Sequence, residues 1–471
     1  VMLTNLAAGT TDATGADTIT NSKDVTLNVI GNAASFDAGV TITGGATAVD
    51  TLTIIADGAD AILSGTSYMN KVVIQDSATQ GTDVEITPDP ADATTPALEI
   101  DGTALDAGAG SADETLTLDG DSVTLTVLTA TGGKGADTLL GGAANDVLSG
   151  GAGADQLNGN GGVDNLSGGA ANDTFVVDSV GETYSATYGA TTMDGGAGTD
   201  TVAFQSAQTH TAATLAGISN TEVWTLPQDS NFTISDAVLT ANPGLSIRIA
   251  GNGTLSGGED TAGGALMTSA INVTSTAAGN LNLIGSSADD TFTFYATESL
   301  TADDTIDGNA GSDTIYIVND DNLNGVGDTT TATFGANTKG IEKIVITDAS
   351  ADDSLGDVTI TINNGYLDTA LTVDGSQQDM NSITLTNEER LTLTSNDVNV
   401  ALTVLGGAGA DSITTNAGLD HITGGGGADS IASGDGADTI YGGDGVDAIR
   451  GEGGTDYIEA GAGNDVITVD D

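Results

Sequence analysis

The chain has 471 residues, of which 67 are acidic and 8 are Lys or Arg, giving a formal net charge of −59. This charge excludes nucleic acid and anionic membrane surfaces as direct partners and favours cations. Cysteine is absent, so any cross-links are not disulfides. Disorder is the alternative for a very acidic chain. However, 38% of the residues are hydrophobic and fall in short alternations, which indicates thin, stacked β-structure.

The first 131 residues are expected to form irregular coils of a parallel β-helix. Thr-rich alternating segments such as VTLNVI and DTLTII supply the strands, and prolines mark a loop near 80–100. No apolar run reaches the length of a membrane span, and no signal peptide opens the chain. Both ends look cut, so we expect a segment of a longer protein whose targeting signals lie outside it.

Residues 132–176 contain a nine-residue phrase repeated five times without a gap: GGKGADTLL, GGAANDVLS, GGAGADQLN, GNGGVDNLS and GGAANDTFV. Each copy opens on glycines, has an aspartate at its sixth place and an apolar residue two places later. The sixth-place aspartates are Asp137, Asp146, Asp155, Asp164 and Asp173.

Residues 177–405 are expected to be β-rich, with isolated turns of the same type. Complete copies occur at 195–203, with Asp200, and at 308–316, with Asp313. Weaker copies lie at 12–20, 285–293 and 299–307. Each complete copy is followed by a short strand that we describe as G-I-x-x-E-V: GISNTEVWTL from Gly217 and GIEKIVITD from Gly340, with a looser echo at 65–76.

Residues 406–471 carry the phrase seven times. The aspartates are Asp411, Asp420, Asp429, Asp438, Asp447, Asp456 and Asp465. Some copies in the two arrays depart from the pattern: Thr415, Asn416, Ser433 and Ala460 replace leading glycines, and Ala144 and Ala171 replace the fourth-place glycine. We expect weaker or distorted sites at these turns.

A fixed short period predicts a solenoid. Six glycine-rich residues form a turn, the last three form a short strand with one inward side chain, and two copies close one coil. Aspartates two copies apart then stack at a strand spacing of roughly 4.8 Å. At an effective dielectric constant of ~20, two such carboxylates repel by about 3 kcal/mol. Carboxylates and loop carbonyls are hard oxygen ligands that suit Ca²⁺.

A simpler interpretation is that these aspartates only cap turns, as aspartate often does. It would be preferred for a single copy. Unbroken, in-phase arrays favour calcium instead.

The nonamers resemble the calcium-binding β-rolls of the RTX (repeats-in-toxin) family, with consensus G-G-x-G-x-D-x-U-x. The resemblance is specific over 132–176 and 406–468 and extends to the single copies. It implies that the sixth-place aspartates and the carbonyls around the glycines bind several Ca²⁺ ions. The alternation of calcium-type turns with Thr-rich β-segments resembles RTX-type surface-layer proteins of Gram-negative bacteria, of the Caulobacter kind, in which calcium drives a paracrystalline coat.

The predicted fold is therefore all-β, with parallel β-solenoid segments interleaved with RTX β-rolls. No HExxH, GxSxG or phosphate-loop motif is present, so we expect no enzyme in this segment. His210 and His421 belong to no metalloprotease motif, and Trp224 and Tyr366 are expected to be packing residues.

We expect a secreted, cell-surface structural protein that assembles with copies of itself into a lattice or filament. The resemblance implies type I secretion, and cell-surface polysaccharide is a further partner if a region outside this segment binds it. Membrane insertion is not expected. The alternative is the calcium-binding portion of an RTX exoenzyme, toxin or large adhesin.

Overall fold

The computed structural model describes two compact units within the chain. The described residues are 2–4, 18–20, 28–32, 41–43, 51–56, 61–67, 70–76, 83–88, 97–105, 114–124, 126–177, 191–257, 267–275, 280–295, 300–319, 330–335, 337–348, 357–363, 370–377, 390–396 and 400–469. The first unit comprises Val1–Ser206, Thr211–Thr225 and Ala237–Leu245. The second comprises Ala207–His210, Leu226–Asp236 and Ser246–Asp471.

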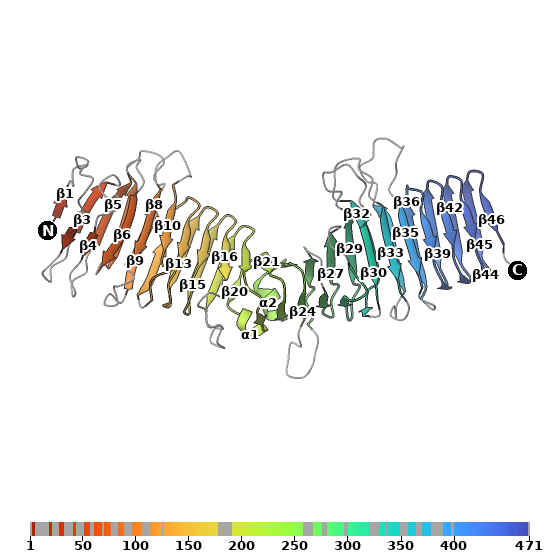
Figure 1. The fold of residues 1–471 in the computed structure, drawn as a ribbon, viewed down its shortest axis with the longest axis horizontal. Helices are drawn as coiled ribbons and strands as arrows, with labels where there is room; N and C mark the ends of the chain where they lie inside the picture. Colours follow the sequence, from red (N-terminus) through yellow and green to blue (C-terminus); the bar gives the residue numbers. More distant parts are fainter. Residues whose placement is uncertain are drawn as a thin grey trace. The chain divides into compact units, whose positions relative to one another are not determined.

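The first unit is a solenoid whose strands alternate between two parallel sheets (Figure 1). One sheet contains β1 (Met2–Thr4), β3 (Asn28–Asn32), β5 (Thr51–Ala56), β7 (Lys71–Asp76), β9 (Ala97–Ala104), β11 (Val127–Thr131), β13 (Val147–Ala152), β15 (Asn165–Ala170), β17 (Thr192–Ala197) and β20 (Ile218–Ser219). The other contains β2 (Thr18–Thr20), β4 (Thr41–Thr43), β6 (Ala61–Ser67), β8 (Val84–Pro88), β10 (Leu116–Asp119), β12 (Thr138–Leu140), β14 (Gln156–Asn158), β16 (Thr174–Val177), β18 (Thr201–Phe204) and β21 (Val223–Leu226).

The second unit is also a solenoid of parallel strands. One sheet contains β23 (Ser246–Ile249), β25 (Asn272–Ser275), β27 (Thr291–Tyr295), β29 (Thr314–Asn319), β32 (Lys343–Asp348), β34 (Leu371–Gln377), β36 (Leu402–Gly407), β39 (His421–Gly426), β42 (Thr439–Asp444) and β45 (Tyr457–Ala462). A second contains β19 (Thr209–His210), β22 (Ser230–Ile234), β24 (Gly253–Gly257), β26 (Leu281–Ile284), β28 (Thr305–Asp307) and β31 (Thr338–Lys339).

A third sheet of this unit contains β30 (Thr330–Phe334), β33 (Val358–Ile362), β35 (Leu391–Ser395), β37 (Ser412–Thr414), β40 (Ser430–Ala432), β43 (Ala448–Arg450) and β46 (Val466–Thr468). A small fourth sheet contains β38 (Ala417–Gly418), β41 (Asp435–Gly436) and β44 (Gly453–Gly454). The solenoid fold predicted from the repeat is thus confirmed.

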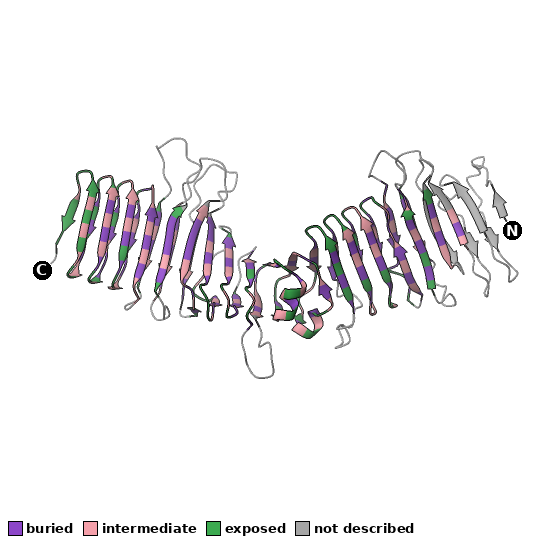
Figure 2. Cartoon of the chain, turned by 180° about the vertical axis from the view of Figure 1, so that it is seen from behind, coloured by how far each residue is buried: buried purple, intermediate pink, exposed green. Residues whose placement is uncertain are grey.

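Within the arrays, the register follows the predicted coil of two nonamers. Leu139 pairs with Leu157, 18 residues later, and Leu157 pairs with Phe175. These three side chains are fully buried and form one column of the core. The same alternation runs along most strands, where buried and partly exposed residues take turns (Figure 2). Each inward side chain therefore packs mainly on the equivalent residue of the next coil.

The sheets are continuous across two of the predicted domain boundaries, those at 131/132 and 405/406. β11, which ends at Thr131, pairs with β13 of the first array. β34 likewise pairs with β36, which crosses residue 405. Coils with and without the nonamer therefore share continuous backbone ladders.

Two short helices complete the described part of the chain, α1 (Ala212–Leu215) and α2 (Asp236–Ala241). None of the described helices has the length and apolar character needed to cross a membrane. The predicted copy at 12–20, the loop near 80–100 and the echo at 65–76 lie partly outside the described residues, and Tyr366 lies entirely outside them.

The fourth place of the nonamer gives a test of backbone strain. Ala171 has a left-handed φ of 82°, whereas Ala144, at the same place in another copy, does not have a positive φ. Left-handed backbone costs an L-residue roughly 1–2 kcal/mol, and glycine avoids this cost.

We therefore expect Ala171→Gly to raise the free energy of unfolding by about 0.5–1 kcal/mol, after the entropy of the more flexible unfolded chain is subtracted. Ala144→Gly is the matched control and should lower it by about 0.5–1 kcal/mol. Urea unfolding at fixed calcium measures both, and the same sign for the two variants would contradict the assignment of strain.

Candidate metal centre

The sixth-place aspartates form columns along the turns, one residue per coil step. In the later copies of each array, Oδ1 of the aspartate accepts the backbone N–H of the aspartate one coil earlier, whereas the first aspartates, such as Asp137 and Asp411, accept a leucine N–H. Asp155 receives Asp137 N–H at 2.7 Å, and Asp173 receives Asp155 N–H at 2.8 Å. The second array repeats this bond between Asp411 and Asp429 at 2.8 Å. In each column, this arrangement places one carboxylate between adjacent coils.

The second carboxylate oxygen is where the turns differ. In the first two copies, Gly133 N–H donates to Oδ2 of Asp137 and Gly142 N–H to Oδ2 of Asp146, both at 2.6 Å. These aspartates are hydrogen-bonded within their own turn.

In later turns Oδ2 is buried and accepts no hydrogen bond. This holds for Asp155, Asp173, Asp200, Asp313, Asp420, Asp429, Asp438 and Asp447. In the turns that begin with two glycines, the second glycine is then left-handed, for example Gly151 (φ 113°) and Gly425 (φ 116°). With the backbone in that conformation, its N–H does not reach the carboxylate. A buried acceptor without a donor costs about 1–3 kcal/mol, so these oxygens need a partner from outside the chain.

A carbonyl oxygen faces the same place as this free oxygen. A Cβ built on Gly424 would collide with Oδ2 of Asp429 and lie 2.6 Å from the carbonyl oxygen of Gly442, one coil further. At Gly168 the corresponding oxygens are Oδ2 of Asp173 and the carbonyl of Gly195, at 2.7 Å. The glycine, which has no side chain, thus lets two acceptor oxygens lie close to its Cα. Acceptor oxygens grouped without a donor suit a cation with hard oxygen ligands.

Carboxylates alone do not make this site. Among the described residues, no three His, Asp or Glu side chains gather as a metal-binding group. A cation between coils would therefore be held by paired carboxylates and backbone carbonyls. The residues present fit Ca²⁺, which takes 6–8 oxygen ligands in flexible geometry and accepts carbonyls readily.

Burial strongly perturbs these carboxylates. It raises the pKa of Asp155 and Asp313 to about 7 and that of Asp137, Asp146, Asp173 and Asp429 to about 6. Burial also raises the pKa of Asp200 and Asp438. Repulsion by the neighbouring Asp137 and Asp173 adds a smaller increase at Asp155. Desolvation is thus a larger obstacle to ionisation than the repulsion expected from the sequence, and a bound cation would offset both.

The turns that begin with hydroxyl residues differ from the glycine turns. Thr415 Oγ1 donates to the carbonyl oxygen of Ser433 at 2.7 Å, and Ser433 Oγ donates to the carbonyl of Gly451 at 3.0 Å. These hydroxyl groups donate hydrogen bonds to carbonyl oxygens, whereas a turn that begins with glycine has no side chain to do so. This is a physical reason to expect weaker cation sites at Asp420 and Asp438.

The remaining predicted residues are less enclosed or less regular. Asp456 and Asp465, in the last coils, are only partly buried, and their Oδ1 atoms accept the N–H groups of Asp438 and Asp447 at 3.1 Å. Asp164 accepts Asp146 N–H at 2.8 Å through Oδ1. The structure therefore places them in the same columns.

Two glutamates outside the predicted set belong to these columns. Asp200 N–H donates to Oε2 of Glu222 at 2.7 Å, and Asp313 N–H donates to Oε2 of Glu342 at 2.8 Å. The sequence pattern G-I-x-x-E-V includes the two segments that contain these glutamates, but it places Gly217 and Gly340 at equivalent positions. That alignment is wrong, because the strand register makes the two glutamates equivalent: the residue after each glutamate pairs with the residue after the aspartate.

The two histidines and the tryptophan lie apart from these columns. His210 is buried against Phe232, with ring centroids 4.5 Å apart, and burial lowers its pKa to about 4. His421 is exposed on its strand. Trp224 is fully buried, as expected of a packing residue.

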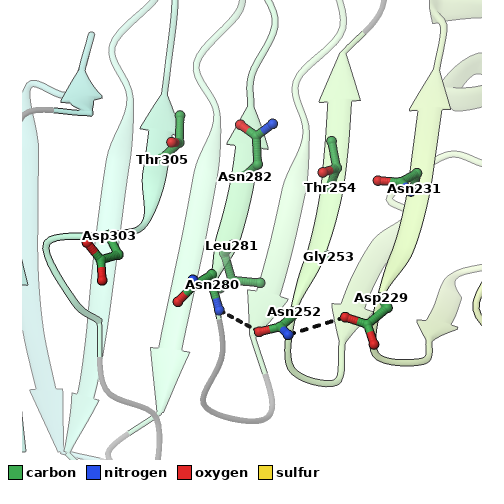
Figure 3. A pocket seen from close by; sticks show the side chains of 10 residues that line it. All are labelled: Asp229, Asn231, Asn252, Gly253, Thr254, Asn280, Leu281, Asn282, Asp303 and Thr305. Carbon is green, nitrogen blue, oxygen red and sulfur yellow. Dashed lines mark hydrogen bonds between the residues drawn. The ribbon is translucent and has the colours of Figure 1, made fainter.

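A separate polar hollow of about 470 Å³ lies on the sheet of β22, β24, β26 and β28 (Figure 3). Asn231, Thr254, Asn282 and Thr305 form one row in register across these strands. In a second row, Asn252 donates to Asp229 at 3.2 Å. The hollow contains none of the sixth-place aspartates.

Comparison with protein families identifies the turns. The sequence model of one protein family, the RTX calcium-binding nonapeptide repeat, matches residues 129–157, 140–175, 300–316, 405–440 and 433–467. These ranges include the two arrays and the single copy with Asp313. Curated proteins give no significant match to the chain. RTX nonapeptide repeats bind calcium and are typical of secreted extracellular proteins, so several repeats imply several calcium ions in this chain.

The leading glycine should be required where its open face meets two oxygens. We expect Gly424→Ala to cost about 1–3 kcal/mol of calcium-bound stability and to weaken calcium binding, because the new Cβ meets Asp429 and Gly442. Gly426→Ala is the control, since its nearest neighbour would lie 3.4 Å away and Ala408 occupies the equivalent place one coil earlier. Calcium titration calorimetry and thermal unfolding measure both, and equal behaviour of the variants would refute the site.

The metal-free protein should lose stability as the pH rises. Folding raises the pKa of the buried aspartates above the unfolded value of 3.8. Their contribution to stability is therefore complete below that value and is lost as the pH rises through about 6 to 7. We expect the melting temperature in chelator to fall between about pH 4 and about pH 7. Calcium affinity should rise over the same range, because calcium requires the ionised carboxylates.

Scanning calorimetry in chelator tests this dependence. Asp155→Asn should make it shallower, because one of the titrating aspartates is removed, and the exposed Asp121→Asn should leave it unchanged. A melting temperature that rises with pH in chelator would contradict the assignment.

Proposed function

We propose that the chain is an extracellular structural protein that assembles with copies of itself into a calcium-dependent surface layer. The observation that carries the proposal is the distribution of the calcium-type turns. They are built into both units and share backbone ladders with coils that lack them. A calcium module serving a neighbouring catalytic domain needs one block, whereas a scaffold uses calcium along its length.

The surface charge supports calcium control of assembly. At a net charge of −59, copies of the chain repel one another, and screening at physiological salt reaches only roughly 8 Å. Acidic side chains such as Glu85, Glu99 and Asp194 are exposed on the outward faces of strands. Close contacts between copies would therefore need divalent bridges or local neutralisation.

Calcium also suits export. Coils whose buried carboxylates lack a partner are destabilised where calcium is scarce, so the chain would remain unfolded in a low-calcium cytoplasm. Extracellular calcium sites typically have dissociation constants of about 10⁻⁴ to 10⁻³ M. Folding would then follow secretion, which is compatible with one-step export through a type I channel.

Light scattering across a calcium titration tests this function. We expect sheets or filaments at millimolar calcium, visible by electron microscopy, and dispersed monomers after chelation. Magnesium at equal concentration is the control and should not assemble the protein, since it demands a tighter octahedral geometry. A flat scattering trace with the fold intact by circular dichroism would reject the coat and favour the calcium-binding portion of an exoenzyme, toxin or adhesin.

A further inference from the structure

Two columns of aspartates end at a glutamate in a turn that is not a nonamer, whereas the column that contains Asp164 ends where Asp164 N–H donates to Thr191 Oγ1 at 3.3 Å. After the copies at 195–203 and 308–316, the next coil is closed by a different turn. Within the arrays, Asp155 N–H and Asp411 N–H each donate to a carboxylate 18 residues later. At the two ends the carboxylate comes from Glu222, 22 residues after Asp200, and from Glu342, 29 residues after Asp313.

The backbone around the two glutamates is the same in both units. The residue two places before the glutamate is left-handed, with φ 52° at Asn220 and φ 60° at Gly340. The N–H of Glu222 and that of the following residue both donate to the carbonyl of Asp200 at 3.0 Å. Glu342 and its successor bond to Asp313 in the same way, both at 3.1 Å. The recurrence in two unrelated loop contexts indicates a built feature.

Each closing turn also places a carbonyl oxygen near the aspartate Oδ2, as the turns of the arrays do. A Cβ on Gly195 would meet the carbonyl oxygen of Asn220 and lie 2.6 Å from Oδ2 of Asp200. A Cβ on Gly308 would meet the carbonyl oxygen of Gly340 and Oδ2 of Asp313. The carbonyl that the next nonamer supplies within an array is thus replaced by that of the left-handed residue.

The aspartates at these ends carry the strongest sign of a missing ligand. Asp200 and Asp313 are both 0% exposed, and their Oδ2 atoms accept no hydrogen bond. Each points toward the carbonyl of the closing turn, beside the glutamate. A buried oxygen of this kind requires a donor or a cation.

In the first unit, a buried hydrogen-bond network fixes the closing turn. Asn242 Oδ1 accepts both the N–H and the hydroxyl of Thr221, and its amide donates to the carbonyl of Ile218 at 2.9 Å. Trp224 Nε1 donates to the Thr221 hydroxyl at 2.8 Å. The glutamate is therefore presented by a rigid turn, which reduces the entropy lost when it binds a ligand.

We propose that Glu222 and Glu342 are calcium ligands that close the two columns, each sharing one ion with the preceding aspartate and the carbonyl of the left-handed residue. The extra methylene of glutamate lets a carboxylate take the place of the next aspartate in a turn that lacks the nonamer. Two carboxylates then balance the charge of one Ca²⁺. The proposal rests on calcium binding alone and does not depend on surface-layer assembly.

Terbium(III) is a suitable probe, because it replaces calcium at oxygen sites and emits when a nearby indole transfers energy to it. Trp224 is the single tryptophan of the sequence, and its strand pairs residue by residue with the strand that follows Asp200. Trp-sensitised terbium emission therefore reports on the Glu222 site. Equilibrium dialysis with calcium counts the sites of the whole chain.

We expect Glu222→Gln, which keeps a hydrogen-bond acceptor and removes the charge, to weaken Trp-sensitised terbium binding by about 10-fold or more. The calcium count should fall by one ion per chain. Glu342→Gln should also lose one ion but keep the Trp-sensitised emission. The exposed Glu85→Gln is the control and should change neither quantity.

The proposal is overturned if Glu222→Gln binds terbium and calcium as the wild-type protein does, with its fold intact by circular dichroism. The glutamate would then only cap the Asp200 N–H. Should that variant fail to fold, the calcium count of Glu342→Gln in the other unit decides in the same way.

Discussion

The buried turn carboxylate, which is hydrogen-bonded through only one of its two oxygens, governs the rest of the structure. Oδ1 joins two coils by accepting a backbone N–H, as Asp155 does from Asp137. In the later turns Oδ2 is buried, accepts no hydrogen bond from the described residues and lies near a backbone carbonyl oxygen. A buried carboxylate without a partner lowers the stability of the fold, and a cation between the coils would offset this loss by binding the carboxylate. The leading glycine follows from this packing, because a Cβ there would collide with Oδ2 and with the carbonyl oxygen of the next coil.

The thin core makes this interaction important for stability. Each short strand of the arrays contributes one inward side chain, such as Leu157 or Ile431, so a coil buries little apolar surface by itself. The ladder of backbone hydrogen bonds and the stacked apolar columns hold neighbouring coils together. An ion at the turn adds an electrostatic interaction with the oxygens of both coils. The stability of the arrays is therefore coupled to the calcium concentration around them.

The same constraint explains how the columns that contain Asp200 and Asp313 end. A column that simply stopped would leave the last aspartate N–H and the last buried oxygen without partners. Glu222 and Glu342 satisfy the N–H from turns that are not nonamers. Coils without calcium-type turns can then follow in the same backbone ladder, as β21 follows β18 and β32 follows β29. This continuity lets one solenoid combine both kinds of coil.

The sequence by itself determined the period, the coil of two nonamers, the inward columns and the positions of the aspartates, because a nine-residue repeat leaves one way to stack its side chains in register. It could not decide which carboxylates are satisfied within their own turn. Gly133 and Gly151 look alike in sequence, yet only the second is left-handed, since glycine permits both signs of φ. Sequence spacing also misaligned the closing turns on Gly217 and Gly340. Asn220 and Gly340 share a left-handed backbone despite different residue types, and the distance from aspartate to glutamate varies with the loop between them, so only the tertiary structure brings Glu222 and Glu342 to equivalent places.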